Sequence, residues 1–216
     1  MPDDRSAAQI YVLAGPNGAG KSSVLGSGLT ERNLDFFNPD QVAERARRAR
    51  PRWSVEQANS FAWREGQRLL DNAIANGLRF AFETTLGGTT VTRRLEECLI
   101  AGGEVRMWFV CLDTPARHIE RVRRRAAAGG HDIPDELIRR RYDASRRNLI
   151  RLIPRLTELI VFDNSADGEP DQGLQPLPVR VLRTANRKLL ELCEPSAVPE
   201  WAKPVVMAAL TASGER

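Results

Sequence analysis

A chain of 216 residues with 42% apolar residues, 28% charged residues and a formal net charge of +4 has the composition of an ordinary globular protein, long enough to bury one sizeable core. No apolar run reaches the roughly 18 residues needed to cross a bilayer, and the N-terminus lacks the features of a secretory signal, so we expect a cytoplasmic protein. Its cysteines, Cys98, Cys111 and Cys193, are odd in number and far apart, which fits neither a disulfide framework nor a metal cluster and favours buried small side chains.

An apolar run over residues 10–14 predicts a buried first strand, and a helix is expected from residue 21 to about residue 29. Between them lies a stretch that fits the phosphate-loop pattern of two glycines five apart followed by Lys-Ser. Its residues are Gly15, Pro16, Asn17, Gly18, Ala19, Gly20, Lys21 and Ser22, with Ser23 directly behind them. Lys21 is the only lysine before Lys188 in a chain that otherwise carries arginine, which favours a functional loop over a merely structural glycine-rich turn.

These residue types have a physical reason. Glycines allow successive backbone N–H groups to face an anion at the start of a helix, where the ammonium group of Lys21 can reach the β- and γ-phosphates. The hydroxyl group of Ser22 is the expected magnesium ligand. We predict that this loop binds a nucleoside triphosphate as a substrate together with Mg²⁺, and the loop alone leaves the choice between ATP and GTP open.

Two carboxylates follow the next predicted strands. Residues 35–37 form a short strand end that Asn38 and Pro39 stop, with a helix expected at 41–50. Asp40, just beyond the strand, is a candidate catalytic base, or else it belongs only to the acidic first turn of that helix.

The capping box at Ser54 predicts a long helix that extends to Gly77. A short strand over residues 79–82 then carries Glu83 to its carboxyl end, and a helix is expected from about 90 to 101.

The strongest strand pattern covers residues 105–112. Asp113 follows it like a Walker-B acid, but we interpret it as structural because Thr114 can cap, and Pro115 can open, the next helix.

Positive charge is concentrated between residues 117 and 155, where twelve arginines stand against five acids. The nucleotide's phosphates, a nucleic acid, or the solvation of a helix face would each explain this excess. Helices at 116–128 and 134–148, joined by a glycine-containing hinge, predict a mobile lid over phosphates. We interpret His131 in that hinge as a hydrogen-bonding residue and not as a catalyst.

A fifth strand over residues 159–162 leads to Asn164, a candidate nucleotide-binding residue. A polar surface loop is expected up to 178, followed by an edge strand at 179–182 and a helix at 185–192. The role of the residues after Glu194 is left open.

Strands that alternate with helices predict an α/β protein with a P-loop NTPase fold, that is, a mainly parallel central sheet with helices on both faces and an arginine-rich helical lid. We expect one domain over 1–216, with the lid at about 116–148 and a C-terminal extension at about 166–216. Ligands gather at the carboxyl ends of parallel strands, so the phosphate loop, Asp40, Glu83 and Asn164 should lie along one rim.

With these residues in view, the chain resembles the zeta-toxin family of phosphate-loop kinases, in particular its chromosomal branch of predicted ATPases or kinases. The resemblance covers about residues 10–165 and rests on six blocks in order. These are Gly-Pro-Asn-Gly-Ala-Gly-Lys-Ser at 15–22, Asn-Pro-Asp at 38–40, Phe-Glu-Thr-Thr-Leu at 82–86, Arg-Val at 121–122 with Gly-Gly-His-Asp-Ile-Pro at 129–134, Arg-Arg-Tyr at 140–142, and Asp-Asn-Ser at 163–165.

The resemblance implies an ATP-dependent phosphotransferase, since zeta toxins phosphorylate a sugar hydroxyl of UDP-N-acetylglucosamine. It implies Asp40 as the base, Glu83 as the residue that positions the substrate or a metal-bound water, and Arg125 and Arg140 as lid residues that hold the γ-phosphate. The choice within 139–141 and the identity of the acceptor stay open. A small antitoxin that blocks the nucleotide site is an implied partner.

The residues themselves leave two other functions open. A hydrolase or switch would share Lys21 and Ser22 but would have no need of Asp40. A nucleic-acid binder or polynucleotide kinase would place the basic segment on a phosphate backbone, although Tyr142 is the only aromatic residue in that segment.

Overall fold

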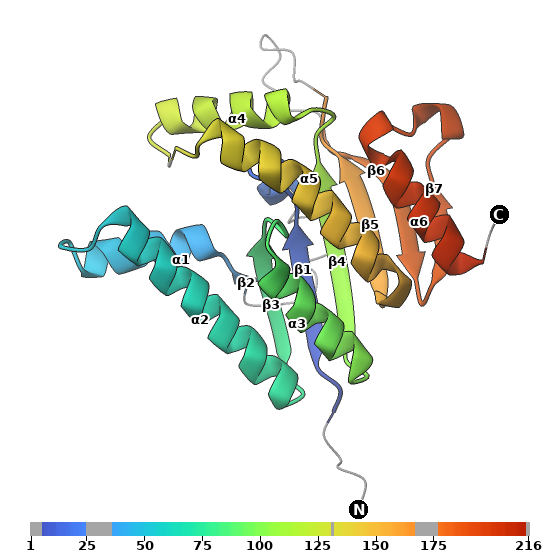
Figure 1. The fold of residues 1–216 in the computed structure, drawn as a ribbon, viewed down its shortest axis with the longest axis horizontal. Coiled ribbons are helices and arrows are strands. Elements are labelled where there is room, and N and C mark those ends of the chain that lie inside the picture. The colour runs from blue at the N-terminus through green and yellow to red at the C-terminus, as the bar shows by residue number, and fades with distance from the viewer. Residues whose placement is uncertain (1–5, 25–35, 131, 167–176, 215–216) are drawn as a thin grey trace, which may run out of the picture.

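The computed structural model describes residues 6–24, 36–130, 132–166 and 177–214. Their strands form one seven-stranded sheet in the order β2-β3-β1-β4-β5-β6-β7 (Figure 1). The strands are β1 (Gln9–Ala14), β2 (Phe36–Phe37), β3 (Arg79–Thr84), β4 (Glu104–Cys111), β5 (Glu158–Asp163), β6 (Val179–Ala185) and β7 (Lys188–Leu192). The first five pair in parallel, and β6 and β7 add an antiparallel end to the sheet.

The apolar run of β1 explains its central position. Ile10 and Val12 face one core while Tyr11 and Leu13 face another, and all four side chains are buried. A strand of this kind is stable only where both of its faces are covered, which is typical of parallel sheets. Because the five parallel strands run in the same direction, their carboxyl ends meet at one edge of the sheet, where the connecting loops can build a site.

Six α-helices lie within the described ranges. They are α1 (Pro39–Ala49), α2 (Val55–Ala75), α3 (Thr89–Ile100), α4 (Pro115–Ala127), α5 (Asp135–Leu152) and α6 (Lys203–Ser213). Figure 1 shows α2, α3, α5 and α6 over the same face of the sheet, and Leu70, Leu95 and Leu149 join the main core there. On the other face, Val24 of the 3₁₀ helix Lys21–Val24 packs with Tyr11 and Trp108. The expected α/β architecture with a mainly parallel sheet is confirmed.

Local signals place several helix starts. Ser54 and Gln57 form the expected capping box at the start of α2, and Thr114 caps α4 with Pro115 at its first position. Within the described ranges, no helix has both the length and the apolar character that a bilayer span requires. Cys98 and Cys111 are buried as expected, and Cys193 is half-buried.

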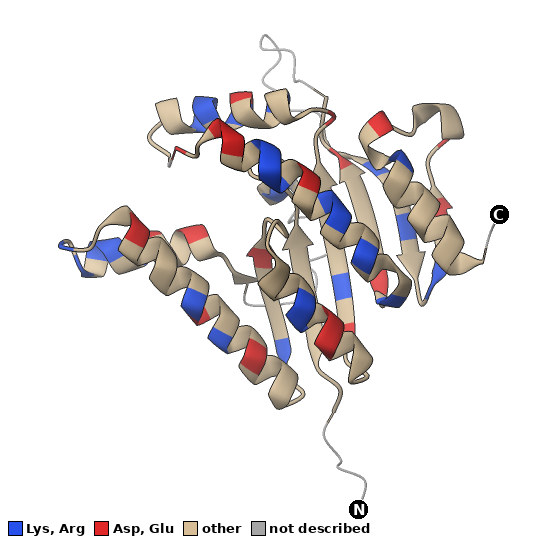
Figure 2. Ribbon diagram, viewed as in Figure 1, with Lys and Arg blue, Asp and Glu red and all other residues tan. Residues whose placement is uncertain are grey.

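The basic segment coincides with α4 and α5, where Figure 2 shows Lys and Arg interleaved with acidic residues. Several of its arginines form surface ion pairs, namely Arg123 with Asp135, Arg124 with Glu120 and Arg146 with Asp143. Part of the local positive charge is therefore balanced on the helices themselves.

Two expectations for the C-terminal part are wrong. Residues 185–192 form no helix, because β7 occupies most of them and pairs with β6, which is therefore not the edge strand. Asn186 and Arg187 have φ values of 49° and 63°, the geometry of a two-residue turn whose twist suits an antiparallel hairpin. Leu189 and Leu192 have the spacing of one helix face, but they pack against the main core as residues of a strand.

The C-terminal residues carry one element that the sequence analysis did not anticipate. Val205, Val206 and Ala209 of α6 are buried in the main core, and Trp201 of the 3₁₀ helix Glu200–Ala202 is buried just before them. The helix expected from 21 to about 29 is described only up to Val24. Most of the polar loop expected before 178 lies outside the described residues.

Candidate active site

The phosphate loop leaves β1 in a conformation with a positive φ at three glycines, Gly15, Gly18 and Gly20, and the first two lie directly against backbone of other elements. The backbone N–H of Gly15 donates to the carbonyl oxygen of Thr84 (3.2 Å), so the loop begins against β3. Gly15 has a φ of 145°, and a Cβ there would lie 2.0 Å from the carbonyl oxygen of Val110. Gly18 has a φ of 77°, and its Cβ would lie 2.5 Å from the carbonyl oxygen of His118. The two glycines therefore set the path of the loop past β4 and α4.

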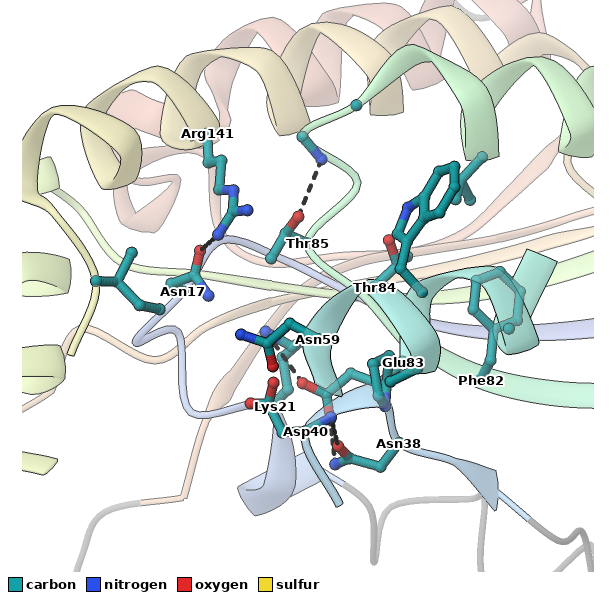
Figure 3. Close-up of a pocket in the computed structure, with 18 of the residues that line it drawn as sticks. Asn17, Lys21, Asn38, Asp40, Asn59, Phe82, Glu83, Thr84, Thr85 and Arg141 are labelled. Carbon is teal, nitrogen blue, oxygen red and sulfur yellow. Dashed lines mark hydrogen bonds and ion pairs between the residues drawn. The ribbon is translucent and has the colours of Figure 1, made fainter. Parts of the chain in front are cut away.

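Lys21 closes this loop with its side chain buried. Its ammonium group donates to the carbonyl oxygens of Gly15 (3.0 Å) and Pro16 (3.2 Å) and lies 3.3 Å from Oε1 of Glu83. Figure 3 shows Lys21 beside Glu83 at the cavity. A single cation thus joins the phosphate loop to a carboxylate at the end of the neighbouring strand, β3.

Asn38 organises the opposite rim. Its Nδ2 donates to Oε2 of Glu83 (3.1 Å), and its Oδ1 accepts the backbone N–H groups of Asp40 (2.9 Å) and Gln41 (3.3 Å), which caps α1. One side chain therefore fixes Glu83 and also sets the start of the helix that carries Asp40. Asp40 does lie in the acidic first turn of α1, and it lines the cavity as well, so the two interpretations of this residue do not exclude each other.

A cavity of about 630 Å³ collects the predicted residues. Lys21, Asp40 and Glu83 line it from the sheet edge, and Arg125 and Arg140 line it from α4 and α5. Asn17 and Gly18 of the phosphate loop also line this cavity. A cation-bearing phosphate loop, two carboxylates and several arginines from the basic segment thus share one space.

Arg141 lines the same cavity and contacts the phosphate loop directly. Its Nη1 donates to Oδ1 of Asn17 (2.8 Å) (Figure 3). Burial, aided by the neighbouring Arg140, lowers the pKa of Arg141, while the Asp40 carboxylate acts in the opposite direction. Arg139 is exposed and does not line the cavity, so within the triplet 139–141 the last two arginines are the ones that reach the site.

Helix α2 supplies a wall of the cavity that was not predicted from the sequence. Asn59, Trp63 and Gln67 line the cavity at intervals of four residues, which places them on one face of the helix. The side chain of Trp63 is 53% exposed. At Gly66 a Cβ would come within 2.9 Å of the Phe37 ring, so the glycine lets this ring lie against α2. In the sequence, the polar residues Asn59 and Gln67 on one face of the predicted helix could have indicated this wall.

Asn164 holds the phosphate loop from the end of β5. Its side chain is buried, and its Nδ2 donates to the carbonyl oxygen of Ala19 (2.9 Å). Its backbone N–H donates to the carbonyl oxygen of Cys111 (2.9 Å). A Cβ on Gly20 would lie 2.3 Å from the same Nδ2. Asn164 therefore lies at the expected rim and contacts the loop from behind, outside the 630 Å³ cavity.

His118 is a further residue that was not predicted from the sequence, and it contacts the phosphate loop. It is fully buried, its Nδ1 lies 2.7 Å from the carbonyl oxygen of Asn17, and its Nε2 lies 3.2 Å from the backbone nitrogen of Leu112. Since Nδ1 faces a carbonyl oxygen and Nε2 accepts an N–H, the imidazole is neutral and carries its proton on Nδ1. Burial lowers the pKa of His118 to about 4, and the charges of Lys21 and Arg121 act in the same direction. The neutral imidazole thereby fastens α4 to the phosphate loop.

Asp113 makes the contacts of a structural residue. Its carboxylate lies 3.2 Å from Nε of Arg117, and its carbonyl oxygen accepts a hydrogen bond from the hydroxyl group of Tyr142 (2.7 Å). Its backbone N–H donates to Oγ of Ser165 (2.8 Å). It does not line the cavity. His131, the hinge residue, lies outside the described residues.

The residues present fit magnesium as a substrate-bound ion. Ser22 is exposed at the end of the phosphate loop and offers a hydroxyl oxygen. The described part of the chain holds no group of three or more His, Cys, Asp or Glu that could bind a metal by itself. In phosphoryl-transfer sites Mg²⁺ keeps several waters and takes its other ligands from substrate phosphates and a few protein oxygens, and the Ser22 hydroxyl group can be one of these.

Comparisons with known proteins fit this arrangement. The family model described as zeta toxin matches residues 1–166. A shikimate kinase of Alteromonas mediterranea is 33% identical over 129 residues, which are 59% of this chain and 73% of that protein. A shikimate kinase of Colwellia psychrerythraea is 33% identical over 116 residues, 52% of this chain and 65% of that protein.

Two solved structures share the fold at low identity. One is the PezAT chromosomal toxin–antitoxin system of Streptococcus pneumoniae, with a TM-score of 0.55, 13% identity and coverage of 100% of this chain and 90% of that chain. The other is the AvrRxo1-ORF1:-ORF2 complex with ATP, with a TM-score of 0.60, 15% identity and coverage of 96% of this chain and 64% of that chain. At these identities the likeness concerns the fold alone.

Proposed function

The chain belongs to the zeta-toxin family, and on this premise we propose that it is a kinase that transfers the γ-phosphate of ATP to a hydroxyl group of a small molecule. The family match and the kinase relatives support ATP-dependent phosphotransfer in general. The observation that carries the finer proposal is the 630 Å³ cavity, in which Asp40 and Glu83 share one space with Lys21, Arg125 and Arg140.

Phosphoryl transfer depends mostly on positioning and on neutralising charge, and each part has a candidate here. Asp40 accepts the proton of the acceptor hydroxyl, whose oxygen forms a bond to the γ-phosphorus while the bond to the bridging oxygen of ADP breaks. The loop amides and Lys21 hold the β- and γ-phosphates. Arg125 and Arg140 neutralise the charge of the moving group from the side of α4 and α5.

Glu83 positions the acceptor or a metal-bound water in this proposal. Its two oxygens have different partners, Lys21 on one and Asn38 on the other. When a phosphate engages the ammonium group of Lys21, the Asn38 contact keeps Glu83 in place and leaves its other oxygen available to the cavity. Mg²⁺ held by Ser22 and the phosphates supplies further neutralisation of phosphate charge when it is bound.

The α2 wall supports a hydroxylated acceptor. The side-chain amides of Asn59 and Gln67 can hydrogen-bond hydroxyl groups, and the exposed ring of Trp63 can cover an apolar face of the same molecule. A UDP-N-acetyl sugar is the first acceptor to test because zeta toxins use one. Shikimate is the second because sequence relatives of this chain are named shikimate kinases.

A small antitoxin protein is the proposed protein partner. Two structural neighbours of this chain are a toxin–antitoxin system and an ORF1:ORF2 complex, which supports testing a small protein partner. Occlusion of the nucleotide site would be the simplest way for such a partner to block the proposed reaction.

ATP consumption and phosphorylated products, measured with each acceptor and with none, test the proposed function. Asp40→Asn should lower turnover by about 10²–10⁴-fold because it removes the base, with ATP affinity nearly unchanged. Glu44→Gln is the matched control, since Glu44 is an exposed residue of the same helix that pairs with Arg48.

The same measurements separate the other functions. ATP consumption that needs no acceptor and survives Asp40→Asn would identify a hydrolase or switch and contradict the assigned base. Binding to single-stranded nucleic acid that weakens steeply with salt would instead point to a nucleic-acid substrate.

A further inference from the structure

The chain beyond residue 166, where the family match ends, contacts the strand end that supports the phosphate loop. Trp201 is 3% exposed, and its ring lies 6.2 Å from the Phe109 ring, centroid to centroid. Its indole Nε1–H donates to Oδ1 of Asp163 (2.8 Å), the last residue of β5. Figure 1 shows the helix that follows Trp201, α6, beside α5 on the same face of the sheet. The C-terminal segment therefore reaches the rim at which the site lies.

Asp163 is a junction of two hydrogen bonds. The oxygen that accepts the indole N–H of Trp201 also accepts the hydroxyl group of Ser165 (2.6 Å). Ser165 in turn accepts the backbone N–H of Asp113 with its Oγ (2.8 Å), and its carbonyl oxygen accepts Nη1 of Arg117 (2.7 Å). By fixing Ser165, Asp163 joins the end of β5 to the start of α4.

Asn164 lies between these two residues and holds the phosphate loop. Its Nδ2 donates to the carbonyl oxygen of Ala19 (2.9 Å) and fills the space beside Gly20, where a Cβ would lie 2.3 Å away. A displacement of Asp163 or Ser165 would shift Asn164 and with it the loop amides. A continuous series of contacts thus runs from Trp201 to the backbone that would receive the phosphates.

We propose that Trp201 is a positioning residue for the nucleotide. Its indole N–H holds Asp163, and through Asp163 it keeps Asn164 and Ser165 where they shape the phosphate loop for ATP. The C-terminal extension is in this way part of the nucleotide site although it lies outside the family match. The inference rests on the proposed function in one respect, namely that ATP is the nucleotide bound.

Trp201→Phe removes the N–H donor and retains most of the aromatic volume. Calorimetric titration with ATP, without any acceptor, should give a dissociation constant about three- to tenfold higher than that of the wild type, because only part of the effect of one lost hydrogen bond to a charged group is transmitted through Asp163 to the phosphate loop. Asp163→Ala should weaken binding at least as much, and adding Trp201→Phe to it should change the affinity no further. Asp163→Asn keeps an oxygen that can accept both bonds and should retain most of the affinity.

Val205→Ala is the matched control, because Val205 is a fully buried residue of α6 that takes no part in these hydrogen bonds. It should lower the midpoint of thermal unfolding without changing ATP affinity. If Trp201→Phe and Asp163→Ala bind ATP as tightly as the wild type, this inference alone is overturned. A wild-type protein that does not bind ATP would overturn the proposed function, and this inference with it.

Discussion

Acidification should destabilise the fold through His118, the buried imidazole that fastens α4 to the phosphate loop. Burial lowers the pKa of this group from 6.5 to about 4. The unfolded chain therefore takes up a proton on His118 as the pH falls through 6.5, whereas the folded chain does so only near 4. The stabilisation is fully present above pH 6.5 and is lost progressively as the pH falls to about 4, where the loss amounts to about 3 kcal/mol.

Urea unfolding at several pH values measures this effect. Between about pH 7 and pH 5 the wild type should lose about 2 kcal/mol of unfolding free energy more than His118→Gln does. The glutamine can still donate to the Asn17 carbonyl and accept from Leu112, but it does not titrate. Because the two proteins differ only at residue 118, the difference between their pH profiles isolates His118. Parallel pH profiles would refute the reasoning, since the folded protein would then protonate His118 as easily as the unfolded chain.

Two further substitutions test the local structure. Gly18→Ala should lower the unfolding free energy by more than about 2 kcal/mol, because a φ of 77° strains an L-residue and its Cβ would lie 2.5 Å from the His118 carbonyl oxygen. Urea unfolding measures the loss, and Gly88→Ala is the control because a Cβ there meets nothing within 4 Å. Ser54→Ala removes the capping box of α2 and should lower the same free energy by about 1 kcal/mol, whereas Ser60→Ala, at an exposed position of that helix, should leave it nearly unchanged. Equal effects of the two serine changes would contradict the role given to the cap.

The parts of the fold that were predictable are those with local physical causes. The caps at Ser54 and Thr114 need only a side chain and a backbone N–H a few residues away, so they can be recognised in the sequence. The segment at 185–192 contains good helix formers at helical spacing, but pairing with β6 gives its backbone another set of partners. That pairing depends on a turn with positive φ at Asn186 and Arg187, residues that do not form an Asn-Gly or Asp-Gly signal.

The same distinction applies to the site. Lys21, Asp40 and Glu83 could be placed together because each lies at or beyond the carboxyl end of a parallel strand, and the ends of such strands share one edge. His118 and Trp201 could not, because their partners Asn17 and Asp163 lie 101 and 38 residues away. Only the packing of α4 on the loop, and of the C-terminal segment on β5, brings these pairs into contact.

The basic segment has two kinds of arginine, and the difference bears on its partner. Arg123, Arg124 and Arg146 form exposed ion pairs with nearby acids, which contribute little to stability but reduce the charge that a long polyanion would meet. Arg125 and Arg140 instead face the cavity that holds Lys21. The cations that reach the cavity therefore converge on a compact space beside the phosphate loop, which suits the phosphates of one nucleotide better than an extended backbone.

The contacts of α4 and α5 also limit how a lid built from them can close. Near its start α4 is held through His118, whose Nδ1 lies 2.7 Å from the Asn17 carbonyl oxygen. Midway along α5, Arg141 donates to the Asn17 side chain, and Tyr142 donates to the backbone of Asp113. A rigid swing of both helices would break these contacts and disturb the phosphate loop at the moment it must hold ATP. For the lid predicted from the sequence, closure is therefore expected where α4 ends and α5 begins, beyond these attachments. There Arg125 would approach the γ-phosphate in the proposed reaction while the phosphate loop stays fixed.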